Sequence, residues 1–405
     1  MNVYKSLFLG LVGLFFASCV EEYKIPTEFI SISEMDIVIN GRIIQGDKSV
    51  IYLSKTVPLY SEDEAESILN AHIKIVGKNG YESELAEFDI ENDCYTIDTY
   101  HLPDNTLYSL KVEVEGETYQ SEYVSLLKTP EIDEVTYKER NDGISIHVSS
   151  YDNGNASKYY LWTYEEDWEF HALVNWTALQ LPVYDKKIYP GDFTDGSNPF
   201  FYCWKHTHSA NIHLYNTGTL QENSVKEVEL LRIPVEDNRI SYIYSILVKQ
   251  CSIDANAYNY YNTIKQYSEN TNGLFTPMPM EIKGNVTCIS NPNKRVIGYV
   301  LGSDIKSKRI FIYESDFETI ESMYDPDCVT KRPPDPNSDA ERGWQSVWRQ
   351  MIEAGAVAST PTGKYEPLNN PEYRESVLYS RDCVDCRAVE GATKKRPDFW
   401  PTDHE

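Results

Sequence analysis

The stretch YSLKVEVEGETYQSEYV, residues 108–124, decides the fold class of this chain. From Tyr108 to Val114 every second residue is apolar, while the residues between them are polar or charged. This period of two is typical of a β-strand with one buried face. Gly116 then turns the chain into the second half of the stretch. The stretch therefore predicts a half-buried antiparallel hairpin.

The same period recurs on the N-terminal side of this hairpin. Apolar residues alternate in Met35–Ile39 and Ala71–Ile75, and Val50–Leu53 is a short apolar run. Asn79-Gly80 supplies the residue pair that accepts positive φ in a tight turn. Because several short strands and turns follow one another at close spacing, we predict an immunoglobulin-like β-sandwich over residues 34–128.

The strand pattern also continues on the C-terminal side of the hairpin. The segments Ile144–Val148, Tyr159–Tyr164 and Tyr242–Val248 are rich in β-branched or aromatic residues. We predict that residues 131–405 form a larger antiparallel β domain with two short helices. The chain as a whole is therefore predicted to be mainly β.

The two helices are predicted near residues 254–269 and 339–354. Asp254 can cap the first helix through its side chain. The second helix follows Ser338, with Glu341 three residues later in the spacing of a capping box. This helix carries an apolar stripe with two tryptophans, which we expect to pack against the protein because amphipathic helices generally bury that side.

Composition limits the possible partners. The chain has 405 residues, of which 41% are hydrophobic and 13% aromatic, so it can bury more than one core. Its 37 Lys and Arg stand against 63 Asp and Glu, and the formal net charge is −26. Such a charge repels phosphate backbones, and we find no local basic stripe. We therefore predict that the protein does not bind nucleic acid.

The N-terminus is predicted to be a lipoprotein signal peptide, residues 1–18. Its apolar run, Leu7–Ala17, has the length of a signal-peptide core and is too short to span a bilayer. The run ends in Phe16-Ala17-Ser18-Cys19, which resembles the lipobox of bacterial lipoproteins. We expect Cys19 to be acylated, with residues 19–33 as the tether. The alternative is an ordinary secretory signal with an incidental cysteine.

An acidic pair, Glu21-Glu22, follows directly after the predicted anchor. It is similar to the surface-export signal of Bacteroidota lipoproteins. This similarity implies an outer-membrane lipoprotein whose globular part faces the cell exterior. The alternative is that the pair only solvates the tether, in which case the protein can face the periplasm.

Seven of the eight cysteines remain once Cys19 is assigned to the anchor. Because an exported protein lies in an oxidising compartment, we expect structural disulfides, with at least one thiol left over. Cys383-Val384-Asp385-Cys386 has the spacing of a redox motif, but no βαβ pattern surrounds it. A structural role is therefore the preferred interpretation of this motif, and the sequence does not fix which cysteines pair.

The histidines His206 and His208 are two residues apart and face the same way on a strand. Cys203 or His213 could complete a set of metal ligands with them. A firm zinc prediction needs four placed ligands and reduced thiols, which this pattern does not supply. We therefore predict no metal site and no cofactor.

Known catalytic motifs were not found in the sequence. It has no Gly-x-Ser-x-Gly elbow, no His-Glu-x-x-His and no phosphate-cradling glycine loop. We predict that the protein is not an enzyme, with a hydrolase of unrecognised site as the remaining alternative. Its 31 tyrosines suit either strands or the stacking of sugar rings.

Several short motifs, taken in order, resemble one family of Bacteroidota lipoproteins, known as domain of unknown function 4249. The motifs cover most of the chain after the signal peptide, and the closing stretch from Cys383 to Trp400 is the most specific. They are Asn40-Gly41, Cys203-Trp204, Val248-Lys249-Gln250, Ala257-Tyr258 with Tyr260, Pro277-Met278-Pro279, Gly284-Asn285-Val286-Thr287-Cys288, Ile297-Gly298-Tyr299, Lys308-Arg309-Ile310, Cys383-Val384-Asp385-Cys386-Arg387, Gly391, Arg396-Pro397 and Phe399-Trp400.

This resemblance implies a role and a set of disulfide candidates, but no catalytic residue. The implied role is that of an accessory or binding subunit of a TonB-dependent barrel transporter in nutrient uptake. Its ligand would be a small nutrient, a glycan or a peptide, and a stand-alone glycan- or peptide-binding surface module is the alternative. The cysteines that belong to the family pattern are Cys203, Cys288, Cys328, Cys383 and Cys386.

Overall fold

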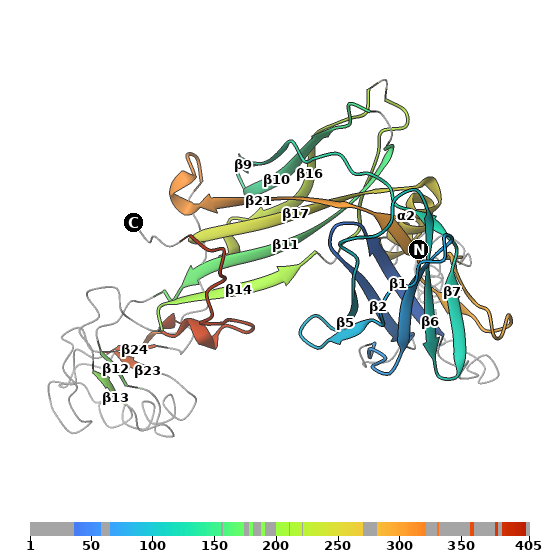
Figure 1. The fold of residues 1–405 in the computed structure, drawn as a ribbon. Coiled ribbons are helices and arrows are strands. Elements are labelled where there is room, and N and C mark those ends of the chain that lie inside the picture. Colours follow the sequence, from blue (N-terminus) through green and yellow to red (C-terminus); the bar gives the residue numbers. More distant parts are fainter. Residues whose placement is uncertain are drawn as a thin grey trace, which may run out of the picture.

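The structure of the protein is a computed structural model, and it is mainly β, as the sequence predicts. A sandwich of short strands lies at one end of a group of long central strands (Figure 1). The predicted signal peptide, Cys19, its tether, Cys328 and the predicted helix at 339–354 lie outside the described residues. The structure describes residues 36–57, 65–154, 157–173, 178–180, 188–190, 200–209, 211–220, 222–269, 282–320, 330–331, 357–359, 377–379 and 383–401.

The N-terminal sandwich consists of two sheets. In the first, the order is β19-β1-β2-β5-β4, with β20 also paired to β1. In the second, the order is β18-β7-β6-β3, with β8 also paired to β6. The strands of the first sheet are β1 (Ile37–Ile44), β2 (Lys48–Lys55), β4 (Glu87–Asp89), β5 (Cys94–Asp98), β19 (Val296–Ile297) and β20 (Val300–Ser303). Those of the second are β3 (His72–Gly77), β6 (Leu107–Val114), β7 (Glu117–Ser121), β8 (Val124–Ser125) and β18 (Val286–Cys288).

The core of this sandwich follows from the period of two in its strands. Ile39 of β1 and Ile73 of β3 are each 0% exposed, and they belong to one apolar cluster between the sheets. The predicted hairpin is confirmed as β6 and β7, in which Val112 lies opposite Tyr119. Gly116 turns this hairpin with a φ of 79°, a value that glycine adopts without strain.

Residues 286–303 belong to this sandwich, which changes the predicted boundary at residue 128. β19 and β20 pair in parallel with β1, and β18 pairs with β7. The prediction assigned these residues to the larger domain because the sequence gives no sign of a strand that returns to a distant sheet. The first sandwich is therefore closed by a segment that comes after most of the second domain in the sequence.

Two glycines and an asparagine allow this return. Gly298 has a φ of 128°, and a Cβ there would lie 2.0 Å from the carbonyl oxygen of Ile39. A Cβ at Gly284 would lie 1.7 Å from the carbonyl oxygen of Gly298. Asn285 accepts from the backbone N–H of Val300 at 2.8 Å and donates to its carbonyl at 2.9 Å. The glycine and asparagine motifs of the sequence thus serve a close backbone crossing.

The larger domain contains a second sandwich. Its three-stranded sheet has the order β16-β10-β9, and its five-stranded sheet has the order β14-β11-β17-β21, with β15 also paired to β11. The strands of the smaller sheet are β9 (Glu134–Arg140), β10 (Gly143–Tyr151) and β16 (Ser224–Pro234). Those of the larger sheet are β11 (Tyr159–His171), β14 (Tyr202–His208), β15 (His213–Asn216), β17 (Ile243–Ile253) and β21 (Ile305–Tyr313).

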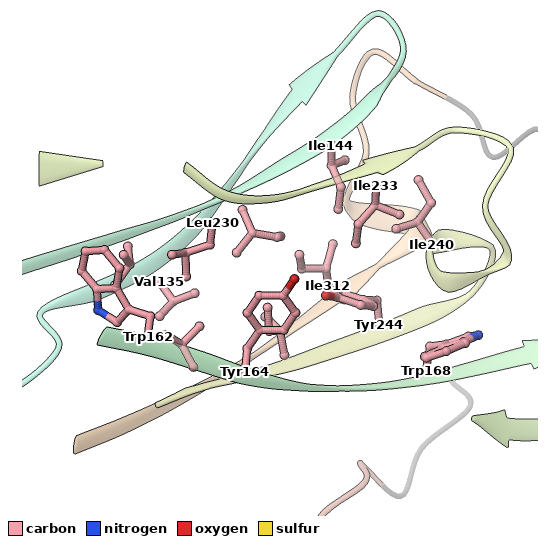
Figure 2. Packing of buried hydrophobic residues seen from close by; sticks show 14 of the residues in the cluster. Val135, Ile144, Trp162, Tyr164, Trp168, Leu230, Ile233, Ile240, Tyr244 and Ile312 are labelled. Atoms are coloured by element: carbon pink, nitrogen blue, oxygen red, sulfur yellow. The ribbon is translucent and has the colours of Figure 1, made fainter. Parts of the chain in front are cut away.

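The core of the second sandwich is rich in aromatic side chains. Tyr164 and Tyr244 point from β11 and β17 toward Ile144 and Ile233 of the smaller sheet (Figure 2). Trp162, which is 1% exposed, donates its indole N–H to Gln250 at 2.8 Å. Because polar tips of buried aromatic rings need a partner, this bond lets a large ring fill the core without an unsatisfied donor.

The first predicted helix is confirmed as α2 (Ala255–Glu269). Asp254 caps it, since its side chain accepts from the backbone N–H of Ala257 at 2.8 Å. Ala257 and Tyr260 are buried in an apolar cluster with Leu161 of β11. The helix therefore covers part of the large sheet close to the N-terminal sandwich.

The remaining elements are short. A small sheet at the other end of the central strands has the order β13-β12-β23-β24-β22 (Figure 1). Its strands are β12 (Ala178–Gln180), β13 (Ile188–Pro190), β22 (Thr330–Lys331), β23 (Val357–Ser359) and β24 (Val377–Tyr379). The 3₁₀ turns are η2 (Asn238–Ile240), η3 (Glu314–Asp316) and η6 (Cys386–Ala388). Within the described part of the chain, no helix is both long and apolar enough to cross a membrane.

Candidate functional site

The candidate site lies on the face of the large sheet that points away from the core of the second sandwich. Strand β11 contains the run Glu165-Glu166-Asp167-Trp168-Glu169. Because side chains alternate along a strand, Glu165, Asp167 and Glu169 share the face opposite to Tyr164 and Trp168. Asp167 is 3% exposed and Glu169 is 0% exposed. Carboxylates at this depth need charged or hydrogen-bonding partners.

Glu166 is the one carboxylate of this run that faces the core. It accepts a hydrogen bond from Arg239 at 2.9 Å and another from the hydroxyl of Tyr244 at 2.8 Å. Asp237 accepts from the same guanidinium at 2.8 Å. Glu166 is thus fully paired with groups inside the sandwich, and we assign it a structural role.

Asp167 is the centre of the network on the outer face. It accepts from the Arg309 guanidinium of β21 at 2.9 Å and from His206 Nδ1 of β14 at 2.6 Å. Arg309 also donates to Ser245 of β17 at 3.0 Å. Burial alone raises the pKa of Asp167, but the bonds from His206 and Arg309 outweigh it and lower the pKa below its ordinary value. Asp167 is therefore ionised across the physiological pH range.

His206 and His208 form a pair at the edge of this network. Their Nε2 atoms are 3.3 Å apart, and both residues are exposed. The hydrogen bond to Asp167 raises the pKa of His206. Burial, followed by the nearby charge of His206, lowers the pKa of His208. The pKa values of the two rings therefore move apart, with the higher value on the ring that contacts the carboxylate.

Glu165 extends the network toward the N-terminal sandwich. It lies opposite His208 in the register of β11 and β14, and it is paired with Lys249 of β17. The pKa of Tyr52 on β2 is raised by burial first, and the charge of Glu165 adds to the rise. The two sandwiches themselves meet further along β11, where Leu161 is buried in one apolar cluster with Tyr299 and Leu301.

The C-terminal segment closes the other end of the same face. Cys203 of β14 forms a disulfide with Cys386, and Trp204 exchanges backbone hydrogen bonds with Thr393. Trp400 donates its indole N–H to Glu169 at 2.7 Å. The Arg309 guanidinium lies 3.7 Å from the centroid of the Phe399 ring, a cation–π contact.

The cysteines confirm most of the disulfide candidates and correct one. Cys203 and Cys386 are bonded to each other, and Cys383 is also disulfide-bonded. Cys288 is a free thiol, contrary to its place among the candidates. It is buried on β18, where Ser290 Oγ lies 3.5 Å away and Glu117 Oε2 3.9 Å away. Its position on a returning strand of the first sandwich separates it from Cys203 and Cys386.

Two further cysteines are buried thiols. Cys94 lies on β5 and Cys251 on β17, and both are free. Burial raises the pKa of each thiol. Since the thiolate is the reactive form, neither residue is suited to act as a nucleophile.

The ligand set considered in the sequence does not assemble as a whole. Cys203 is in a disulfide, and His213 lies on β15, which pairs with a different part of β11. Within the described ranges, no group of three or more His, Cys, Asp or Glu residues is placed to hold a metal ion. The sequence singled out His206 and His208, but it missed Asp167 and Arg309. The signal for Asp167 was available as an acidic run inside an otherwise aromatic strand.

An aromatic cluster lies at the disulfide end of the sheet. The rings of His171 and Phe201 stack with centroids 4.8 Å apart, and Tyr202 lies 4.7 Å from Phe201. Tyr242 directly precedes β17, and its ring centroid lies 5.4 Å from that of Tyr202. All four residues are partly exposed. Amphipathic rings in this arrangement can stack on a sugar or on an aromatic side chain of a peptide.

The fold and site define a protein of two β-sandwiches, with a charged network on the outer face of its central sheet and a C-terminal segment held by a disulfide. The chain belongs to the family described as "Domain of unknown function (DUF4249)", whose sequence model matches residues 21–309. That range includes Asp167, His206 and Arg309.

Comparisons with other known proteins add little. A comparison with curated proteins finds no match. A solved structure described as manganese lipoxygenase of Gaeumannomyces graminis with a partial zonadhesin of Komagataella pastoris is 11% identical, with a TM-score of 0.17, covering 55% of this chain and 89% of its own. The collagen adhesin of S. aureus is also 11% identical, with a TM-score of 0.09, covering 70% of this chain and 97% of its own. Neither likeness carries an argument.

Proposed function

We propose that this protein is a lipid-anchored outer-membrane protein that serves a TonB-dependent transporter as an accessory or binding subunit in nutrient uptake. Cys19 carries the lipid, and the two sandwiches face the cell exterior. The observation that carries the proposal is the disulfide between Cys203 and Cys386 in a chain whose residues 16–19 resemble a lipobox. Disulfides persist in exported proteins and are rare in the reducing cytosol.

The anchor is consistent with the energetics of acyl chains. Each buried methylene contributes about 0.8 kcal/mol, and stable attachment needs more than one chain. A diacylated Cys19 meets that requirement. The family resemblance supports the partner, because genes of these lipoproteins commonly lie beside a TonB-dependent transporter.

The ligand-binding surface in this proposal is the charged face around Asp167. It presents two exposed imidazoles and the partly exposed pair of Glu165 and Lys249, backed by the buried pair of Asp167 and Arg309. Polar groups of both signs suit a small polar nutrient, a glycan or a peptide. The neighbouring aromatic cluster adds apolar contact area for the same ligand.

The test of this function is affinity purification of the tagged full-length protein from gently solubilised outer membranes. The proposal predicts that a barrel transporter copurifies in near-stoichiometric amount. A Cys19→Ala variant is the control for the anchor, and it should leave the membrane fraction. Recovery of the wild-type protein from the outer membrane with no barrel protein would contradict the accessory role.

The second candidate is a stand-alone glycan- or peptide-binding module. The observation that favours it is the partly exposed cluster of His171, Phe201, Tyr202 and Tyr242. Binding of one glycan or peptide class by the protein without any copurified transporter would support this candidate. A blank binding screen together with a copurified barrel would remove it.

A further inference from the structure

We propose that His206 and His208 bind a divalent transition-metal ion, with Zn²⁺ as the reference ion, through their Nε2 atoms. The distance between these atoms, 3.3 Å, is the basis of the inference. Zn–N bonds in proteins are about 2.0–2.1 Å long. Two nitrogens 3.3 Å apart and both at that distance from one ion subtend an angle of about 104–111° at the metal. The tetrahedral angle preferred by zinc lies within this range.

The groups behind His206 hold it in the form that a metal requires. Its Nδ1–H donates to Asp167 at 2.6 Å, which leaves the lone pair of Nε2 pointing away from the sheet. A carboxylate behind a histidine ligand is a recurring arrangement in zinc sites, where it fixes the tautomer and makes the ligand more basic. Asp167 is itself held by Arg309 at 2.9 Å. The network therefore positions one ligand before any ion arrives.

The pair is also accessible and favourably charged. Both histidines are exposed, and β14 lies at the end of the sheet order. The carboxylate of Glu165, opposite His208 in the register, contributes negative charge near the ion, although its pair with Lys249 screens part of that charge. The protein offers two ligands here, so the remaining positions belong to water or to a bound molecule.

Without a metal, the short contact between the two rings needs a shared proton. One Nε2 then donates its N–H to the lone pair of the other, which two neutral imidazoles in suitable tautomers can do. A divalent ion can take the place of that proton and satisfy both lone pairs at once. The geometry thus serves either occupant, and their competition can be measured.

The experiment is a calorimetric titration of Zn²⁺ into the mature protein, purified without a histidine tag. We expect one Zn²⁺ per chain, with a dissociation constant that rises at least tenfold in H206N and in H208N. The matched control is H101N, since His101 is exposed on the N-terminal sandwich, outside the site. Its affinity should equal that of the wild type.

A second readout identifies the ligands. With Cu²⁺ in place of Zn²⁺, electron paramagnetic resonance should show coupling to two imidazole nitrogens in the wild type and to one in H208N. Because His208 is exposed, this variant is expected to fold. Absence of saturable 1:1 binding up to millimolar Zn²⁺, or binding by H208N equal to that of the wild type, would overturn the proposal. Neither readout depends on a transporter, so the result is independent of the proposed function.

Discussion

Replacing Arg309 with leucine should destabilise the second sandwich, because Asp167 would keep a buried charge without its guanidinium partner. The side chains of Asp167 and Arg309 are 5% and 17% exposed. Removing one member of a buried ion pair costs about 3–5 kcal/mol. His206 remains bonded to Asp167 at 2.6 Å, so we expect the lower end of that range, about 3 kcal/mol.

Tryptophan fluorescence can follow this change selectively. All seven tryptophans occur from residue 162 onward, and the strands of the N-terminal sandwich contain none. Urea denaturation monitored by tryptophan emission therefore excludes the N-terminal sandwich and includes Trp162, Trp168 and Trp204 of the second sandwich. R309L should shift the midpoint of that transition to lower urea, while hydrogen exchange in β1 and β6 of the N-terminal sandwich should change less.

The control for R309L is an exposed ion pair in the same sandwich. Arg232 pairs with Glu229 on β16, and its side chain is 57% exposed. Exposed pairs contribute about 0–1 kcal/mol, so R232L should leave the midpoint almost unchanged. In the double variant D167N/R309L, the loss should be smaller than the sum of the single losses, because neither charge of the pair is left buried without its partner. Equal losses for R309L and R232L would refute the role given to the buried pair.

Three further predictions use other parts of the structure. Replacing both Cys203 and Cys386 with serine should cost about 2–5 kcal/mol, measured by denaturation of the oxidised wild type and the variant, and an unchanged midpoint would contradict the stabilising role of this disulfide. The G298A variant should destabilise the N-terminal sandwich more than G46A does, because both glycines have positive φ but only a Cβ at Gly298 would meet a backbone atom, at 2.0 Å. Hydrogen exchange should therefore rise in β1 and β19 of G298A, and equal exchange in the two variants would contradict this steric effect. Because the pKa of His206 is raised in the folded state, its pair with Asp167 stabilises the fold fully below the ordinary histidine pKa of about 6.5. This contribution is lost as the pH rises through the pKa of His206 in the folded protein. The stability of H206N relative to wild type should therefore be lowest near pH 5–6, and a difference independent of pH would refute the pairing.

Local patterns in the sequence predicted the local structure well. The hairpin of β6 and β7 and the helix capped by Asp254 follow from period, turn residues and a cap, all of which act within a few residues. The return of residues 286–303 to the first sandwich was not predictable in this way. Strand pairing over such a distance depends on packing between segments, and the sequence shows only the glycines that permit it.

In the candidate site too, the sequence predicted what local spacing determines and missed what the sheet brings together. The sequence singled out His206 and His208 because the two-residue spacing places them on one side of a strand. It did not reveal Asp167 and Arg309 as partners, since these residues come from β11 and β21 and meet only through the sheet order. Cys288 was wrongly predicted to be in a disulfide for a related reason. Its distance from the other cysteines is set by the fold, which the family motif around it does not reveal.

Intact mass spectrometry of the mature protein recovered from the outer membrane is the decisive test of the lipid anchor. We expect a chain that begins at Cys19 and carries the added mass of acyl chains. A chain that retains residues 1–18, or one in which Cys19 is free of lipid, would contradict it.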